Sequence, residues 1–160
     1  MSEETSDAGA GVPFDELSAA DQALCRAALT AADAAYAPYS HFAVGAAVAT
    51  ASGAVFVGSN LENASYGMTI CAEAAALAAA NTAGERELQT VAIVGLPTSG
   101  HSQKSGPITP CGRCRQMIAE FTKPDADVRI LCCDSGLDTV LETTISELLP
   151  YAFARLSLPD

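Results

Sequence analysis

The sequence predicts an α/β domain in which helices cover a mixed central sheet. Helix-like and strand-like segments alternate in the order α-β-β-α-β-α-β, with a further strand near Val140, and this alternation is typical of α/β domains. The 160 residues are one domain's worth of chain. Apolar residues make up 49% of them, which is too large a share for a disordered chain.

The first predicted element is a helix over residues 19–36. Ser18 followed by Asp21 is typical of a helix N-cap with an acidic residue at the third position. The segment that follows is rich in Ala and Leu, which have high helix propensity. Pro38 ends the predicted helix, because proline cannot continue one.

A β-hairpin is predicted next. Residues 42–50 (FAVGAAVAT) and 54–57 (AVFV) have strand character, and Ser52-Gly53 between them is typical of a hairpin turn. Residues 60–67 contain Asn, Ser and Gly and are expected to form turns. The hairpin therefore precedes an irregular segment.

The centre of the chain predicts a helix and then a buried strand. Residues 71–83 are strongly helical by propensity, and Gly84 stands where a helix C-terminal stop is expected. Residues 90–95 (TVAIVG) form a continuous apolar run of strand length. Such a run indicates a strand covered on both faces.

The last part of the chain predicts a loop, a helix, a strand and a short final helix or turn. Residues 97–110 are rich in Pro, Ser and Gly, and a helix over 111–121 begins directly after them. Residues 127–133 (DVRILCC) predict a strand, and the last helix or turn begins at Ser146.

The charge of the chain is strongly acidic and uneven. The formal net charge is −11, and the first 21 residues hold six Asp or Glu and no Lys or Arg. We expect residues 1–16 to be a disordered acidic tail and residues 17–160 to be the folded domain. The net charge argues against binding duplex nucleic acid or an anionic membrane by bulk charge. An alternative reason for the acidity is a high-salt cytoplasm.

Composition also indicates where the protein works and how it assembles. No apolar run approaches the roughly 20 residues that span a bilayer, and the N-terminus lacks the basic and apolar regions of a secretory signal. We therefore expect a cytoplasmic protein. Ala accounts for 32 of the 160 residues and Trp is absent, so the core buries little area per residue. This favours apolar surface covered by neighbouring subunits.

Three of the six cysteines predict a metal site. Cys71 lies in C-A-E, and Cys111 and Cys114 lie in P-C-G-R-C, each group at a predicted helix start. Cysteines three apart on a helix share one face, and a helix N-terminus favours the thiolate that zinc requires. Three thiolates leave the fourth tetrahedral position of Zn²⁺ open to water, as in catalytic zinc sites. Glu73 would stand beside the metal as the acid–base group.

Two other interpretations of these cysteines remain open. The C-x-x-C pair would suit a redox motif, although that leaves C-A-E unexplained. A closed structural zinc site would need His41 or His101 as a fourth ligand. The remaining cysteines are expected to be small buried hydrophobic residues; they are Cys25, Cys132 and Cys133.

Five short motifs together resemble the cytidine deaminases, and specifically the small homotetrameric kind with three zinc-binding cysteines. They occur in the family's order with close to its spacing, over residues 18–155, and C-x-E with P-C-x-x-C is the zinc-deaminase signature. The motifs are AYAPYSHFAVGAA (35–47), GSNLENASYG (58–67), CAE (71–73), PCGRCRQ (110–116) and ELLPYAF (147–153). The resemblance implies a three-layer α/β/α fold with a mixed central sheet.

The resemblance also assigns the zinc ligands and the proton shuttle. It implies that Cys71, Cys111 and Cys114 bind Zn²⁺ and that Glu73 moves protons. One position departs from the pattern, because many relatives have Arg directly after the catalytic Glu and this chain has Ala74. A cation there would draw charge from the thiolates, so its loss puts the tuning of the bound water in doubt.

Substrate contacts follow from the resemblance as well. Phe42 would pack against the pyrimidine, Asn60 and Glu62 would bind the ribose hydroxyls, and the Ala72 backbone N–H would hold the polar edge of the ring. Plain alternatives are that Phe42 belongs to the core and that Asn60 and Glu62 only form a turn. An amide beside a carboxylate suits vicinal hydroxyls, because the two offer donors and acceptors together.

Subunit contacts complete the implied site. Ala64, Tyr66 and Phe153 would lie at interfaces of a homotetramer, with Phe153 reaching toward a neighbour's site. The alternative is that Tyr66 and Phe153 are ordinary core aromatics. The expected substrate-contact residues are Phe42, Asn60, Glu62, Ala72, Tyr66 and Phe153.

The resulting hypothesis is a zinc-dependent hydrolase that converts cytidine and deoxycytidine to uridine and deoxyuridine plus ammonia, in pyrimidine salvage. The partners expected are a small nucleoside and other copies of the chain, with no nucleic acid and no membrane. The second candidate is a deaminase of another aminopyrimidine, such as the blasticidin type. A third, from a different class, is a zinc-stabilised binding module.

Overall fold

A six-stranded sheet forms the centre of the structure, a computed structural model that describes residues 11–98, 104–123 and 125–153. The strand order is β1-β6-β5-β4-β2-β3, in which β4 and β5 are parallel and every other neighbouring pair is antiparallel. The strands are β1 (Val12–Pro13), β2 (Phe42–Thr50), β3 (Val55–Ser59), β4 (Leu88–Pro97), β5 (Arg129–Cys133) and β6 (Thr139–Thr144).

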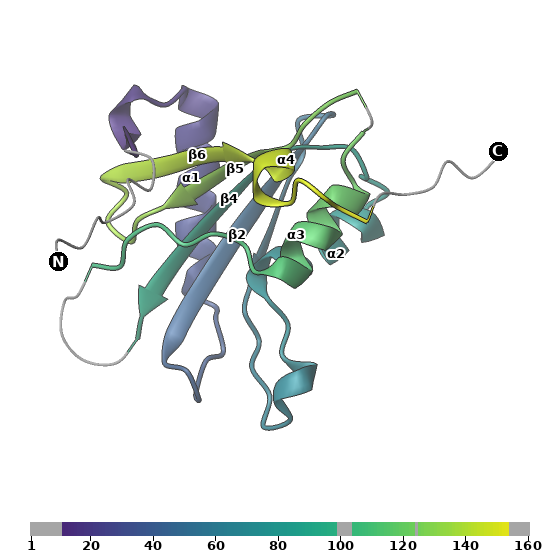
Figure 1. The fold of residues 1–160 in the computed structure, drawn as a ribbon. Coiled ribbons are helices and arrows are strands. Elements are labelled where there is room, and N and C mark those ends of the chain that lie inside the picture. The colour runs from purple at the N-terminus through teal and green to yellow at the C-terminus, as the bar shows by residue number, and fades with distance from the viewer. Residues whose placement is uncertain (1–10, 99–103, 124, 154–160) are drawn as a thin grey trace, which may run out of the picture.

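Helices cover both faces of the sheet, with α1 on one face and α2 and α3 side by side on the other (Figure 1). The fold is therefore three-layered with a mixed sheet, as the sequence predicts. The helices are α1 (Ala19–Ala32), α2 (Ala72–Thr82), α3 (Gly112–Glu120) and the short α4 (Ile145–Leu148), with single 3₁₀ turns η1 (Phe14–Glu16) and η2 (Tyr66–Met68).

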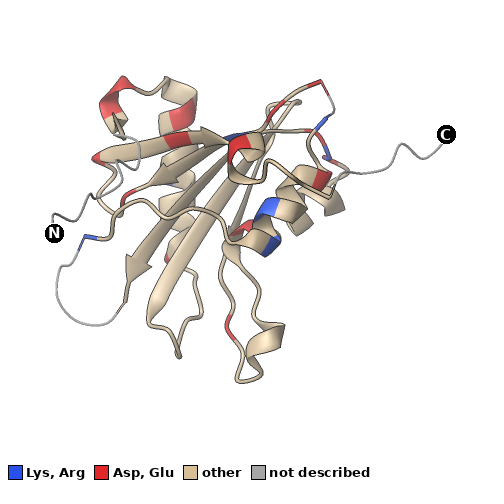
Figure 2. Cartoon of the chain, viewed as in Figure 1, with Lys and Arg blue, Asp and Glu red and all other residues tan. Residues whose placement is uncertain are grey.

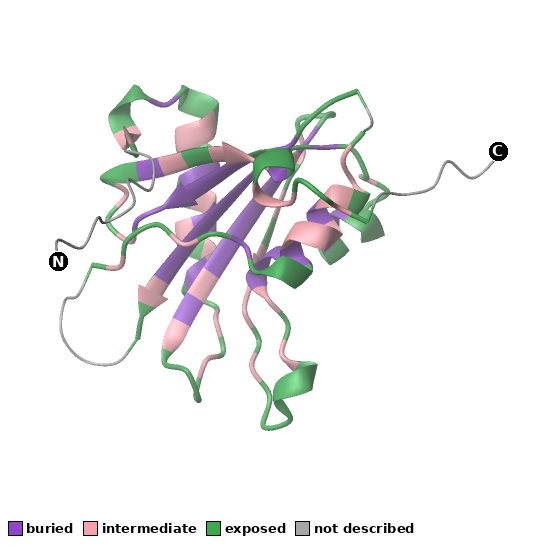
Figure 3. Cartoon of the chain, viewed as in Figure 1, coloured by how far each residue is buried: buried purple, intermediate pink, exposed green. Residues whose placement is uncertain are grey.

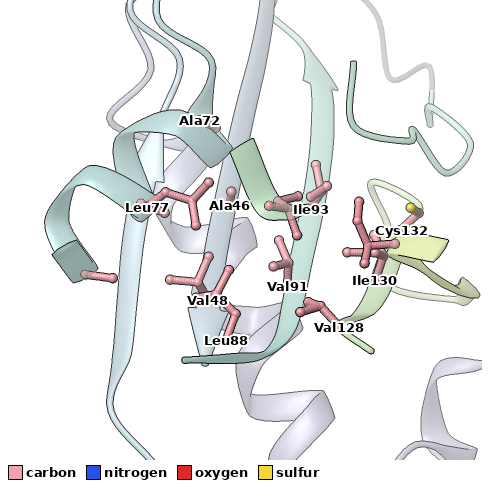
Figure 4. Close-up of a cluster of buried hydrophobic side chains, with 14 residues drawn as sticks. Ala46, Val48, Ala72, Leu77, Leu88, Val91, Ile93, Val128, Ile130 and Cys132 are labelled. Atoms are coloured by element: carbon pink, nitrogen blue, oxygen red, sulfur yellow. The ribbon is translucent and has the colours of Figure 1, made fainter. Parts of the chain in front are cut away.

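The central strands are buried on both faces, as Figure 3 shows along β4 and β5. On β4, Val91 and Ile93 pack toward α2 and α3, whereas Ala92 and Val94 pack toward α1. This alternation follows from the two-residue period of a strand. The cluster beneath α2 and α3 is drawn in Figure 4, where Leu77 of α2 lies against the strand residues. Helices α2 and α3 are therefore fixed to one face of the sheet.

Residues 12–16 correct part of the expectation of a disordered tail over residues 1–16. Val12 and Pro13 pair with β6 as an edge strand, and the Phe14 N–H donates to the Asp138 carbonyl at 3.0 Å. The Arg26 guanidinium lies 4.9 Å from the centre of the Phe14 ring. Residues 12–14 are therefore held by the edge of the sheet and by the contact of the Phe14 ring with Arg26, neither of which the acidic composition indicates. Residues 1–10 lie outside the described residues.

The first helix is shorter than the predicted 19–36. It begins at the expected N-cap, since the Ser18 Oγ accepts the Asp21 N–H at 3.1 Å, but it ends at Ala32. The Tyr36 N–H donates to the Asn60 carbonyl at 3.0 Å, which draws the chain away from the helix axis before Pro38. Across the described residues, each helix is too short or too polar to cross a membrane.

Candidate active site

The N-termini of α2 and α3 bring the three predicted ligand cysteines together. Cys71 is the N-cap residue of α2, Cys111 is the N-cap residue of α3, and Cys114 lies one turn further along α3. Their three Sγ atoms lie within 4.8 Å of one another, and those of Cys71 and Cys111 are 3.9 Å apart. Sequence positions forty residues apart therefore meet at a single point.

This cluster fits a tetrahedral Zn²⁺ ion. With Zn–S bonds of about 2.3 Å, two thiolates of a tetrahedral site lie about 3.8 Å apart, close to the separation of Cys71 and Cys111. Burial, together with the charges of Glu73 and Cys71, raises the pKa of Cys114, and burial also raises the pKa of Cys71. A bound cation would reverse this effect, because it stabilises thiolates. The cysteines are thus arranged for a metal.

The alternative interpretations of the cysteines do not match the geometry. Within the described ranges, the cluster of metal-binding side chains holds these three cysteines and neither His41 nor another fourth ligand. His101 lies outside the described residues. A redox pair would not require the third sulfur beside it. The other cysteines are fully buried in the core, as expected; they are Cys25, Cys132 and Cys133.

Glu73 lies in the first turn of α2, two residues after Cys71, and only 5% of it is exposed. Burial raises the pKa of its carboxyl group, and the Glu73 backbone and the Cys114 thiol offset part of this rise. A raised pKa lies closer to neutral pH, so at that pH the carboxyl group can both accept and donate a proton. This environment suits the acid–base role that the sequence predicts for Glu73.

Two arginines of α3 lie near the cysteines and have different contacts. Arg113 reaches the Thr69 carbonyl through Nη1 at 3.4 Å, just before Cys71. Arg115 donates from Nε to the Pro110 carbonyl at 2.7 Å and from Nη1 to the Leu148 carbonyl at 3.0 Å. Arg115 thus holds the loop that leads into Cys111. These are the blue positions on α3 in Figure 2, on a chain with 19 acidic and only 8 basic residues.

The segment 60–70 forms an arm between β3 and α2, which projects below the sheet in Figure 1. At its base, the Asn60 Oδ1 accepts the Val44 N–H at 2.8 Å and its Nδ2 donates to the Phe42 carbonyl at 3.0 Å. Each amide atom keeps a further donor or acceptor position. Asn60 therefore joins the arm to β2 through contacts that the sequence did not predict. It also retains the capacity to bind a hydroxyl group.

Glu62 lies further along the arm and binds the loop before β2. Its Oε2 accepts the N–H groups of Tyr39 at 2.9 Å and Ser40 at 3.2 Å. The Ser40 side chain, and to a smaller extent these two N–H groups, lower the pKa of Glu62, so the carboxylate stays ionised. These residues line a cleft of about 360 Å³ with Tyr66 and Thr69. A larger cleft of about 610 Å³ lies beside α1, on the sheet face opposite the cysteines.

The remaining predicted contact residues fall into two groups. The Phe42 ring packs over Gly95, because a Cβ added to Gly95 would lie 2.6 Å from the ring. Ala72 is buried in the first turn of α2, where backbone N–H groups have no acceptor within the helix. Tyr66 and Phe153 are 76% and 81% exposed. The alternative that these two are core aromatics is therefore wrong for this chain.

Known proteins resemble this chain in sequence and in fold. The family model described as "Cytidine and deoxycytidylate deaminase zinc-binding region" matches residues 18–130. The chain belongs to this family. A cytidine deaminase of Halalkalibacterium halodurans is 40% identical over 139 residues, which are 87% of this chain and 98% of the relative. The crystal structure of cytidine deaminase from Burkholderia pseudomallei is 44% identical, with a TM-score of 0.68, over 82% of this chain and 97% of that one.

A second solved structure, cytidine deaminase from Mycobacterium tuberculosis, is 38% identical with a TM-score of 0.66, over 83% of this chain and 96% of the neighbour. The predicted fold, family and zinc-type cysteine cluster are therefore confirmed. As a member of this deaminase family the chain is a zinc-dependent enzyme.

Proposed function

We propose that this chain deaminates cytidine and deoxycytidine by hydrolysis, releasing uridine or deoxyuridine and ammonia. The observation that carries the proposal is the meeting of three thiols within 4.8 Å, at two helix N-termini, beside the buried carboxyl group of Glu73. Cys71, Cys111 and Cys114 would hold Zn²⁺. When bound, Zn²⁺ supplies a Lewis acid that makes water a nucleophile at neutral pH.

Glu73 provides the proton transfers that the reaction needs. Its carboxylate accepts a proton from the attacking water and passes it to N3 of the pyrimidine. It next takes the proton of the hydroxyl newly formed on C4 and gives it to the amine that leaves C4, so a single group acts in turn as base and as acid. A raised pKa suits both duties, and burial of Glu73 provides it.

The nucleoside would be oriented by groups on β2, the 60–70 arm and α2. Phe42 would pack against the pyrimidine face, and the Ala72 N–H would hold the polar edge of the ring at the start of α2. Asn60 and the ionised Glu62 would bind the ribose hydroxyls with the hydrogen-bonding positions that their own backbone contacts leave free.

The assembly is proposed as a homotetramer whose substrate sites include residues of neighbouring subunits. Exposed aromatic and aliphatic side chains support this, because apolar groups gathered on a surface are typical of subunit contacts. They are Tyr36, Leu61, Tyr66, Met68, Tyr151 and Phe153. We place the enzyme in pyrimidine salvage in the cytoplasm, with free nucleosides as substrates.

One assay tests the activity and its alternatives. Ammonia release and the change in ultraviolet absorbance are measured with cytidine, deoxycytidine, cytosine, CMP and blasticidin S, each with and without a zinc chelator. We expect turnover of the two nucleosides and its loss with chelator. Turnover of blasticidin S alone would favour the second candidate. A zinc-loaded protein that releases no ammonia from any of these compounds would favour a binding module.

A further inference from the structure

Helix α3 holds the C-terminal segment through two consecutive residues. Arg115 donates to the Leu148 carbonyl at 3.0 Å, at the end of α4. Gln116 binds Phe153 in both directions: its Nε2 donates to the Phe153 carbonyl at 2.9 Å, and its Oε1 accepts the Phe153 N–H at 3.3 Å. The backbone of Phe153 is therefore fixed by one side-chain amide.

The Phe153 ring gains almost nothing from its own subunit. The residue is 81% exposed, and Tyr151 beside it is 97% exposed. Burying a Phe side chain stabilises a folded protein, and Phe153 contributes almost none of this stabilisation within its own subunit. Packing of the ring within one subunit therefore does not hold the Phe153 backbone in this position. The two hydrogen bonds with Gln116 do.

Gln116 and the ligand Cys114 of the same subunit lie on different faces of α3. Gln116 stands two residues after Cys114 on α3, and residues two apart on a helix do not face each other. The polar group that binds Phe153 is therefore separated from the three thiols, although one helix carries all of them. A change at Gln116 can affect the C-terminal segment without removing a zinc ligand.

We propose that Gln116 is a positioning residue that presents Phe153 to the substrate site of a neighbouring subunit. This inference rests on the proposed function and on the proposed tetramer. Helix α3 then contributes to two sites. Cys111 and Cys114 belong to the site of their own subunit, and Gln116 positions Phe153 for the site of the neighbour. The role is a specific one, because the amide supplies both the donor and the acceptor that an exposed backbone segment needs.

The first experiment is a double-mutant cycle on cytidine turnover. Gln116→Ala should raise KM about two- to tenfold, the size of one lost aromatic contact, with a smaller change in kcat. Phe153→Ala should have a similar effect, and the double variant should be no worse than Phe153→Ala. Gln116→Met keeps the length without the hydrogen bonds and should match Gln116→Ala. Additive effects, or a wild-type KM in Gln116→Met, would overturn the proposal.

The second experiment asks in which subunit Gln116 acts. Gln116→Ala is co-expressed with an excess of Glu73→Gln subunits, which lack the proton shuttle but carry an intact Gln116 and Phe153. The remaining active sites then receive Phe153 from normal neighbours, so their KM should return to the wild-type value. A KM that stays as high as in Gln116→Ala alone would place the effect inside one subunit and overturn the proposal.

Two readouts separate this inference from the proposed function. If the wild-type protein releases no ammonia from cytidine, the proposed function fails, whatever Gln116 does. Hydrogen exchange of the peptide that contains Phe153 needs no activity, and it should be faster in Gln116→Ala, with unchanged zinc content. Unchanged exchange would show that Gln116 does not hold the segment. Lost zinc would show that it acts on its own subunit's metal cluster instead.

Discussion

Gly58 of β3 and Ala72 of α2 meet backbone to backbone. A Cβ on Gly58 would lie 2.4 Å from the Ala72 carbonyl oxygen and 2.5 Å from the Ala76 nitrogen. Only a residue without a side chain allows this approach. Because Cys71 caps the same helix and Glu73 lies in its first turn, β3 sets the position of both groups.

Gly58→Ala should therefore damage stability and the site together. An added methyl group must push α2 off the sheet, at a cost of about 1–3 kcal/mol, and the displacement moves Cys71 and Glu73. The melting temperature, the zinc content and kcat should all fall.

Two glycines provide matched controls for Gly58→Ala. At Gly45 an added Cβ would lie 1.9 Å from the Ala28 carbonyl oxygen of α1, so Gly45→Ala should lose at least as much stability while leaving zinc bound. Gly106 has open space around it, and Gly106→Ala should be neutral. If Gly58→Ala keeps full kcat despite a lower melting temperature, β3 does not set the site.

Removal of a single ligand should remove zinc. Cys71→Ala, Cys111→Ala or Cys114→Ala each leaves two thiolates, too few for a stable site, so metal content by atomic absorption and activity should be lost together. Cys133→Ala is the control, because that thiol is buried in the core beneath α1 and should cost some stability but no zinc. Full metal content in Cys111→Ala contradicts the ligand assignment.

Local sequence signals predicted the elements that carry the site. The β2 bounds agree with the predicted 42–50, and α2 and α3 begin within one residue of their predicted starts. The Gly84 stop has a φ of 84°, a left-handed conformation that favours glycine. N-caps, helix propensity and strand periodicity act within a few residues, which is why a sequence shows them.

Contacts between distant segments could not be predicted in this way. The pairing of Val12 with Val140 and the hydrogen bonds from Gln116 to Phe153 join residues far apart in the chain. Nothing in a Gln after C-x-x-C-R specifies its partner. The end of α1 was also missed, because the hydrogen bond from Tyr36 to Asn60 outweighs the helix propensity of the Ala-rich segment.

The ion pair between α1 and β5 should make a measurable, pH-dependent contribution. Arg129 binds both carboxylate oxygens of Asp21 at 3.1 Å. Burial alone would raise the pKa of Asp21, but the hydrogen bonds from Arg129 and Ser18 lower it overall. Since the folded pKa lies below the unfolded one, this stabilisation is complete above about pH 4 and is lost as the pH falls through the folded pKa.

Asp21→Asn should accordingly lower the free energy of unfolding at pH 7 by about 0.5–1 kcal/mol, a modest value because solvent screens the guanidinium. Urea titrations at pH 7 and pH 3 check this, and the difference from wild type should shrink at pH 3. Glu142→Gln is the control, because Glu142 contacts Arg129 at a longer 3.4 Å and should matter less. An equal difference at both pH values contradicts the ionic origin.

Assembly should depend on the exposed aromatic residues of the arm. Light scattering of the wild type should give a mass about four times the 16.3 kDa of one chain. Tyr66, 76% exposed, forms an edge-to-face pair with Tyr39 at 6.0 Å between ring centres, so the two rings present one surface. Tyr66→Asp should weaken the tetramer and lower activity together. A fully active wild-type monomer would exclude shared sites.

Glu73→Gln should abolish turnover while the metal and the fold remain. The amide fills the same space but moves no proton, and proton transfer is worth about 10²–10⁴-fold in rate, here over more than one step. A variant that keeps more than about a tenth of the wild-type kcat would remove Glu73 from the mechanism.

The same substitution should stabilise the metal-free protein. Burial raises the pKa of Glu73, so the folded state holds its proton at pH values where the unfolded chain has lost it, and stability declines as the pH rises above the unfolded pKa of about 4.3. The neutral amide of Gln avoids this loss. In chelated protein at pH 7, Glu73→Gln should therefore melt above the wild type, and the difference should vanish below about pH 4.

Glu62→Gln is the contrast, because hydrogen bonds from the Tyr39–Ser40 loop lower the pKa of that carboxylate, and its loss should destabilise the fold at pH 7. If the two variants shift the melting temperature in the same direction, the burial of Glu73 does not set its charge, and its fitness as both acid and base loses its physical basis.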